Sequence, residues 1–242
     1  MVVAAEKFLD DAAGSARDAR TGLYPSYMAM DEFVDVERLR SFDQYVTQRV
    51  KNYILQQSDP FFLNQHRLER DTPYEPGVRE AWMTRPRQGT PYDYLDIDRT
   101  DIWEFTEAAS EFRLLTDFIK TLPFSAFWRI LLICDDGGRT LSAHRDHEPT
   151  DICHDFIWMR TNKRKPFYTL NPETGEQRFN EGYTAWFDTV NQYHGSEAGE
   201  GLTFSIRVDG RFNEEFRKQI PYNANSMAST PAIWATERGW QA

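Results

Sequence analysis

Three side chains of the types that bind metal ions stand in the second half of the sequence. His144 and Asp146 form a His-x-Asp triplet, and His194 follows fifty residues after His144. Residues two positions apart point to the same face of a strand, so His144 and Asp146 would face together if this segment is extended. Two histidines and one carboxylate form the facial triad that holds non-haem iron(II) and leaves coordination positions open. We therefore predict His144, Asp146 and His194 as metal ligands.

An arginine within an apolar run follows this set. Arg207 lies in the segment Leu202 to Asp209 (LTFSIRVD), and an arginine in an apolar strand is costly to bury without an anion. Its planar guanidinium can bind a carboxylate through two hydrogen bonds. Ser205 would face the same side and add a hydroxyl donor. We predict that Arg207 and Ser205 hold a dicarboxylate co-substrate. A structural ion pair of Arg207 with Asp188 or Asp209 is the alternative.

The neighbouring histidines have other interpretations. His147 is three residues from His144 and could pair with it in a zinc site, but on a strand the two side chains would point to opposite faces. His154 alternates with aromatic residues, which is typical of a core histidine, while a contact to a co-substrate stays open. Asp188 is an alternative iron ligand whose spacing matches no known pattern.

The first half of the chain is expected to be helices and loops. Apolar residues recur at helical spacing from Asp31 to Gln57 and from Asp101 to Lys120, and Asp101 is the expected N-cap of the second helix. The two apolar stripes are Leu39, Phe42, Val46, Val50 and Tyr53, and Ile102, Phe105, Phe112, Leu115 and Ile119. Between the helices, Ser58 to Arg99 is rich in proline and has no clear periodicity, so it forms a functional lid or a meandering cover.

The second half is typical of short strands separated by turns, which indicates an all-β sandwich or barrel. The segments rich in β-forming residues are Phe127–Cys134, Asp151–Thr161, Gly182–Asp188 and Leu202–Asp209. We expect one domain over residues 1–242. Residues 1–121 form a helical and loop cover, 122–212 the β core, and 213–242 a tail that docks through its two tryptophans.

Composition and charge exclude several classes of protein. The chain has 28 Lys and Arg against 38 Asp and Glu, a net charge of −10. This opposes nucleic-acid binding and anionic membrane surfaces, which need a positive face. Two cysteines exclude a disulfide framework and a four-cysteine zinc site. The sequence has no signal-peptide pattern and no stretch of about 20 apolar residues, so we expect a cytoplasmic protein that does not enter a membrane.

In their order and spacing, these segments resemble the iron(II)/2-oxoglutarate-dependent dioxygenases, in particular the branch of the aspartyl/asparaginyl β-hydroxylases and small proline hydroxylases. The resemblance covers Leu122 to Phe212. Its motifs are the strand Trp128 to Cys134, His144-Arg145-Asp146, the segment Gly182 to Asp188, His194 and Arg207-Val208-Asp209. It implies a double-stranded β-helix, a cupin-like jelly roll, preceded by N-terminal helices. It also implies iron(II) on His144, Asp146 and His194, and 2-oxoglutarate on Arg207.

The implied activity is hydroxylation of an unactivated carbon in a free amino acid or a related small metabolite, with O2 consumed and succinate and CO2 released. Asp146, which the aspartyl hydroxylases lack, favours the proline-hydroxylase side and argues against halogenation. The second anchor for 2-oxoglutarate is unassigned, because Cys153 and Asp155, or His154 in a shifted register, occupy the positions where aspartyl hydroxylases have Arg and His. The alternatives are a cupin-like metal enzyme that does not use 2-oxoglutarate and a non-enzymatic jelly-roll binding module.

Overall fold

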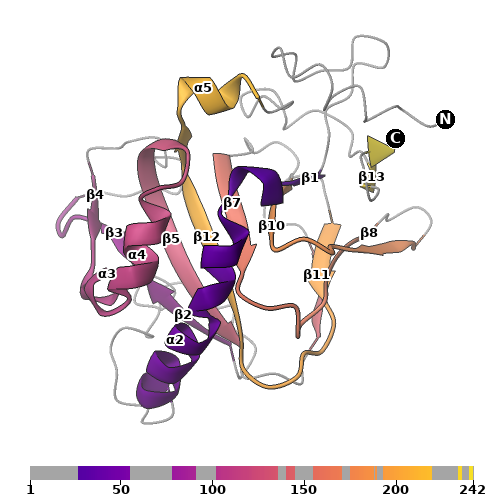
Figure 1. The fold of residues 1–242 in the computed structure, drawn as a ribbon, viewed down its shortest axis with the longest axis horizontal. Helices are drawn as coiled ribbons and strands as arrows, with labels where there is room; N and C mark the ends of the chain where they lie inside the picture. Colours follow the sequence, from indigo (N-terminus) through magenta and orange to yellow (C-terminus); the bar gives the residue numbers. More distant parts are fainter. Residues whose placement is uncertain are drawn as a thin grey trace.

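Two antiparallel sheets form the body of the protein (Figure 1). The computed structural model describes residues 27–54, 78–90, 102–135, 140–144, 155–170, 175–187, 189, 193–219, 234–235 and 240–241. The larger sheet has the order β1-β10-β7-β12-β5-β2. Its strands are β1 (Tyr27–Ala29), β2 (Val78–Trp82), β5 (Phe124–Asp135), β7 (Asp155–Arg160), β10 (Thr184–Phe187) and β12 (Thr203–Phe212).

The smaller sheet has the order β6-β11-β8-β9. Its strands are β6 (Leu141–His144), β8 (Phe167–Leu170), β9 (Gln177–Phe179) and β11 (Tyr193–Ser196). From β5 to β12 the chain crosses repeatedly between the sheets, and the first and last of these strands pair with each other. Between β5 and β12, each sheet contributes four strands, and those of the larger sheet are β5, β7, β10 and β12. Two sets of four strands connected in this way have the topology of a jelly roll. The predicted mainly β class is confirmed, and the strand order agrees with the expected double-stranded β-helix.

The helices lie over one face of the larger sheet, except α5, which lies beyond the end of β12 (Figure 1). They are the 3-10 helix Asp31–Phe33, α2 (Val36–Ile54), α3 (Glu107–Glu111), α4 (Arg113–Ile119) and α5 (Glu214–Arg217). Phe42 of α2 and Phe118 of α4 meet edge to face, with ring centroids 5.5 Å apart. The predicted stripe of α2 is buried at Leu39, Phe42, Val46 and Val50. No helix among the described residues is long and apolar enough to span a membrane.

The prediction of one helix over 101–120 is wrong. Strand β4 (Trp103–Phe105) pairs with β3 (Thr84–Pro86), and the helical part begins only at α3. Phe112 then separates α3 from α4, with φ −96° and ψ 42°. Ile102 and Trp103 pack against Trp128 in a small cluster of their own, so tertiary packing overrides the helical periodicity here.

One further expectation needs correction. The stretch 58–99 is not wholly irregular, because β2 and β3 lie within it, and β2 extends the larger sheet beside β5. In the described residues of the first half, the strands β1, β2, β3 and β4 accompany the helices. In the tail, β13 (Trp234–Ala235) pairs with β14 (Trp240–Gln241).

Strand alternation divides the larger sheet into two chemically different faces. Ile206 of β12 lies opposite Leu132 of β5 and Met159 of β7, and all three are fully buried in the hydrophobic core. The next residue, Arg207, lies opposite Leu131 and Trp158. Directly opposed residues of antiparallel strands share a face, so Arg207 belongs to the face that is turned away from Ile206.

Candidate active site

His144 and His194 lie opposite each other in the ladder between β6 and β11. Their ring centroids are 4.6 Å apart. His194 is buried and His144 is half-buried at the end of β6. His194 lies within strand β11, which runs from Tyr193 to Ser196. Two imidazoles at adjacent strand positions on one face can share one metal ion.

A close approach of β6 to β11 makes this pairing possible. A Cβ atom on Gly195 would lie 2.6 Å from the carbonyl oxygen of Leu141 and 2.6 Å from the hydroxyl oxygen of Tyr168. The register also shifts here, because His194 pairs with His144 while Ser196 pairs with Leu141. β6 thus has one extra residue, a β-bulge, opposite Gly195. The absence of a side chain at Gly195 lets the strands meet at this register.

The ring of His144 is held by its own strand. Its Nδ1 lies 2.9 Å from the carbonyl oxygen of Ser142. A carbonyl can only accept, so Nδ1–H donates and the neutral imidazole presents the lone pair of Nε2. Such a hydrogen bond on the second ring nitrogen is the usual support of a metal-binding histidine. The donor set of two imidazoles therefore fits a divalent transition metal.

The third predicted ligand, Asp146, lies outside the described residues, which contain no cluster of three His, Cys, Asp or Glu able to hold a metal. His147, His154, Cys153 and Asp188 also lie outside them. The structure thus brings together two of the three predicted ligands, and the role of Asp146 stays a prediction.

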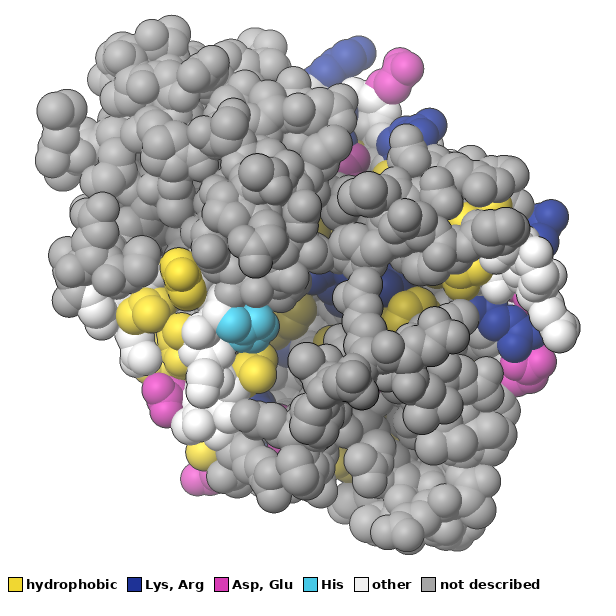
Figure 2. Space-filling view, turned by 180° about the vertical axis from the view of Figure 1, so that it is seen from behind, with side chains coloured by type: hydrophobic (Ala, Val, Ile, Leu, Met, Phe, Trp, Pro, Cys, Tyr) yellow, Lys and Arg dark blue, Asp and Glu magenta, His cyan; other side chains and the backbone are white. Residues whose placement is uncertain are grey.

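Aromatic side chains line the space between the two sheets. The ring centroid of Phe187 in β10 is 4.7 Å from that of His194 and 5.2 Å from that of Phe167 in β8. Phe167 stacks on Trp158 of β7 at 4.7 Å. Figure 2 shows one histidine beside a hollow in which basic and hydrophobic side chains are visible. The ring of His194 therefore borders a part of the interior that is apolar and aromatic.

Arg207 lies on this interior face, and Ser205 shares the face two residues earlier. Arg207 Nε donates to Asp209 Oδ1 at 2.9 Å. Its Cζ lies 4.3 Å from the centroid of the Phe156 ring, a cation–π contact. The structural ion pair given above as the alternative for Arg207 is thus present with Asp209. It occupies the Nε edge of the guanidinium, and binding of a co-substrate by Arg207 and Ser205 stays a prediction.

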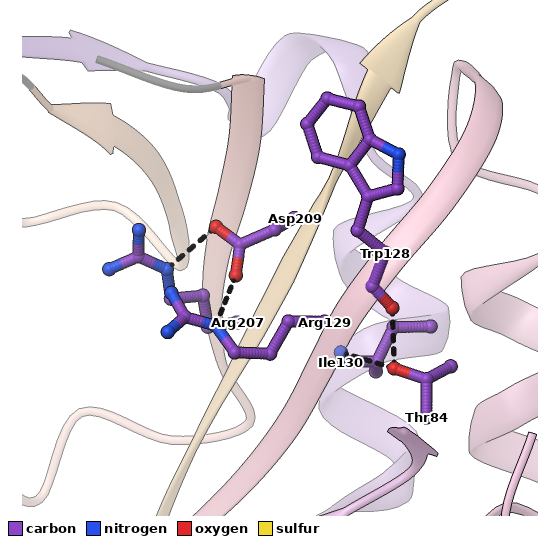
Figure 3. A network of polar contacts seen from close by, with 6 residues as sticks. All are labelled: Thr84, Trp128, Arg129, Ile130, Arg207 and Asp209. Atoms are coloured by element: carbon purple, nitrogen blue, oxygen red, sulfur yellow. Dashed lines mark hydrogen bonds and ion pairs between the residues drawn. The ribbon is translucent and has the colours of Figure 1, made fainter. Parts of the chain in front are cut away.

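Arg129 of β5 is a residue that sequence reasoning missed. Its Nε donates to Asp209 Oδ2 at 2.8 Å, so one carboxylate binds both arginines (Figure 3). Burial acts to raise the pKa of Asp209, but the guanidinium groups of Arg129 and Arg207 outweigh it and hold that pKa below its ordinary value. The signal in the sequence was a single charge inside the apolar run FWRILLIC.

Arg160 shows a different use of a buried arginine. It lies opposite Ser205 at the end of β7. Its Nε donates to the carbonyl oxygen of Gly182 at 3.0 Å, and Nη1 donates to that of Lys165 at 3.2 Å. Nη2 donates to the carbonyl oxygens of Asn180 and Gly182. Because backbone carbonyls engage all three of its nitrogens, Arg160 fixes the chain around β10.

Comparison with known proteins gave structural neighbours only. No protein-family model and no curated protein matches the chain. A prolyl-4-hydroxylase from Pseudomonas putida is similar at 11% identity and a TM-score of 0.45, over 86% of this chain and 98% of that one. A prolyl hydroxylase from Trichoplax adhaerens was solved in complex with a peptide fragment of the hypoxia-inducible-factor oxygen degradation domain. It is similar at 14% identity and a TM-score of 0.46, over 88% of this chain and 93% of that one.

A third neighbour is an oxidoreductase of the 2OG-Fe(II) oxygenase family from Burkholderia pseudomallei. It is similar at 12% identity and a TM-score of 0.34, over 69% of this chain and 80% of that one. With TM-scores below 0.5, these similarities assign neither a family nor an activity to the chain. The function is therefore argued from the residues of the site.

Proposed function

We propose that the protein is an iron(II)- and 2-oxoglutarate-dependent oxygenase. It hydroxylates an unactivated carbon of a free amino acid or a related small metabolite and releases succinate and CO2. His144, Asp146 and His194 hold the metal, and Arg207 with Ser205 holds the distal carboxylate of 2-oxoglutarate. The observation that carries the proposal is the pairing of His144 with His194 across β6 and β11.

Each described residue has a defined task in this proposal. His144 offers Nε2 because its Nδ1–H is bound to Ser142. His194 is buried against Phe187, which excludes water from one side of the metal. Arg207 supplies a cation on the same interior face. Bound iron(II) supplies activation of O2, coupled to the decarboxylation of 2-oxoglutarate.

An anaerobic titration tests the metal and the co-substrate together. Metal-free protein receives iron(II) and then 2-oxoglutarate, and visible absorption follows the weak charge-transfer band of an iron–oxoacid chelate. We expect the band in the wild type and its loss in His144→Ala. Tyr193→Phe is the matched control, because Tyr193 neighbours His194 on β11 and its side chain points to the other face. It should keep the band.

The outcomes separate the proposed roles. Iron binding without the band contradicts the use of 2-oxoglutarate. Full iron binding by His144→Ala contradicts the metal site. Under air, succinate formed in proportion to the 2-oxoglutarate consumed is the second measurement, and a substrate screen among amino acids follows only where succinate appears.

The ion pair between Arg207 and Asp209 favours a second candidate, a cupin-like metal enzyme that does not use 2-oxoglutarate. In that case the pair is structural, and the interior binds a substrate directly at the metal. Iron would then bind to the histidines, no charge-transfer band would form, and no succinate would appear with any substrate. The same titration therefore decides between the two candidates.

A further inference from the structure

Three residues of the smaller sheet form a row on the face that is turned away from the two histidines. Tyr168 of β8 lies opposite Gly195 of β11 and opposite Phe179 of β9. The next residue of β8, Thr169, lies opposite His194. Because successive residues of a strand point to opposite faces, Tyr168 stands behind the histidines. It is nonetheless buried, with 5% of its surface exposed.

The side chain of Tyr168 reaches across β11 to β6. A Cβ atom on Gly195 would lie 2.6 Å from the hydroxyl oxygen of Tyr168 and 2.8 Å from its Cζ, so the end of the phenol lies over Gly195. The hydroxyl donates a long hydrogen bond, 3.5 Å, to the carbonyl oxygen of Leu141 in β6. Phe179 contacts the same ring edge to face, with centroids 5.9 Å apart. Tyr168 therefore forms a strap from β8 to β6 over the strand between them.

Few other contacts hold β6 in place. It is a four-residue strand at one end of the strand order of the smaller sheet, and among the described residues its only partner strand is β11. The pairing joins His144 to His194 and Leu141 to Ser196, with a bulge between the two pairs. Short strands with few contacts open at a low free energy. A metal ligand carried by β6 therefore depends on whatever else fixes this strand.

The strap contacts β6 close to the metal-binding histidine. Leu141 is three residues before His144. Ser142, whose carbonyl oxygen lies 2.9 Å from Nδ1 of His144, is between them. Loss of the strap would let the segment that orients the imidazole move away from β11. Tyr168 itself stands on the opposite face, so it influences the site only through the position of β6.

We infer that Tyr168 is a positioning residue of the metal site. By holding β6 against β11 across Gly195, it keeps the imidazole of His144 where it can share one metal ion with His194. The inference rests on the proposed function and deepens it, because it assigns part of the metal affinity to a residue that touches neither metal nor substrate. It also gives Gly195 a second role, since a side chain there would occupy the place of the phenol.

Cobalt(II) binding tests the strap without turnover. Cobalt(II) accepts the imidazole ligands that iron(II) accepts, and its visible d–d bands depend on the number and arrangement of its ligands. Tyr168→Phe loses only the long hydrogen bond, so it should weaken cobalt(II) binding by about 2-fold to 10-fold. Tyr168→Leu does not reach Leu141. It should weaken binding by about 10-fold to 100-fold, the usual effect of losing a residue that supports a metal ligand, and should change the d–d bands.

Tyr45→Phe is the matched control. The hydroxyl of Tyr45 donates to the carbonyl oxygen of Glu111 at 3.2 Å, between α2 and α3 and outside the smaller sheet. The variant loses a hydrogen bond of the same kind as Tyr168→Phe, and urea unfolding of the metal-free proteins compares their stabilities. Tyr45→Phe should keep the cobalt(II) affinity and the d–d bands of the wild type, because a loss of stability by itself does not move His144.

Hydrogen exchange in the metal-free protein measures the hold on β6 directly. The amides of β6 that bond to β11 should exchange at least about 10-fold faster in Tyr168→Leu than in the wild type, because the strand opens more often. The amides of the larger sheet should keep their rates. Unchanged exchange in β6 would contradict the strap whatever the metal affinity.

The outcomes separate the inference from the proposed function. A wild type that binds neither cobalt(II) nor iron(II) overturns the metal site and the proposed function with it. A wild type that binds both, while the two Tyr168 variants match Tyr45→Phe in affinity and d–d bands, overturns only the positioning role. Tyr168→Phe makes the smaller change, so it keeps the inference testable if Tyr168→Leu does not fold.

Discussion

His194 lies directly opposite His144 in the β6–β11 ladder, with ring centroids 4.6 Å apart, although fifty residues separate the two in sequence. The ladder sets the positions of both backbones, and the bond from His144 Nδ1 to Ser142 orients one of the rings. A metal site at this place therefore depends on strand pairing as much as on the histidines themselves, and the two dependences can be tested separately.

The two histidines should contribute unequally to folding and equally to metal binding. His144→Ala and His194→Ala should each weaken iron(II) binding by more than about 100-fold, because the loss of a ligand exceeds the loss of a second-shell partner. His194 is buried, so only its substitution should also lower the free energy of unfolding appreciably. Metal titration and urea unfolding measure the two effects. Wild-type metal affinity in either variant contradicts the site.

Gly195→Ala should disrupt the metal site without removing a ligand. The added methyl group would lie 2.6 Å from the carbonyl oxygen of Leu141, so β6 must move away from β11. We expect strongly reduced iron binding, with the circular dichroism of the β-sheets retained.

Gly201→Ala is the control for this glycine. Gly201 has φ +66° and open space around its Cβ position, so the substitution costs about 1 kcal/mol of backbone strain and leaves the metal site unchanged. Equal iron affinity in the two glycine variants would show that the β6–β11 approach does not matter for the site.

Asp209→Asn should change the acid stability of the protein. The pKa of Asp209 is lower in the folded protein than its ordinary value of about 3.9. Its stabilising effect is therefore complete well above that value and is lost as the pH falls through the folded-state pKa. At pH 7 the variant should lose about 3–5 kcal/mol, because it removes the partner of two buried cations.

The measurement is the free energy of unfolding in urea from pH 7 down to pH 3. The difference between wild type and Asp209→Asn should shrink below about pH 4, where the wild-type carboxylate begins to lose its advantage. A difference that stays constant over this range would show that the charge of Asp209 contributes nothing to stability.

Cys134 should be chemically inert in the folded protein. Its side chain is buried. Burial is the larger cause that raises the pKa of its thiol, and the nearby negative charge of Asp135 is the smaller one. A Cys153→Ser background leaves it as the single thiol. Reaction with a disulfide reagent at pH 8 should be at least about 1,000-fold slower in buffer than in urea, because it requires opening of the sheet. Rapid reaction in buffer would contradict the burial.

The local elements are mostly determined by the sequence. The stripe from Leu39 to Val50 specifies α2, because helical periodicity and burial coincide there. The runs around β5 and β12 specify strands, because β-branched and aromatic residues fit a half-buried sheet. Residue type and spacing also single out His144, His194 and Arg207, since each is an unusual residue in its surroundings.

Tertiary structure alone decides what these residues contact. The four residues Tyr193–Ser196 form β11 only because β6 and β8 pair with them on both sides, and no periodicity in so short a segment predicts that. Arg207 binds Asp209, and Asp209 also binds Arg129, which lies eighty residues away in the sequence. The pairing of β5 with β12 brings these two side chains together, because Val208 lies opposite Ile130. Register and bulges arise from pairing between strands that are distant in sequence. The sequence therefore indicates which residues could bind a metal or an anion, and the pairing of the strands determines how those residues lie relative to one another.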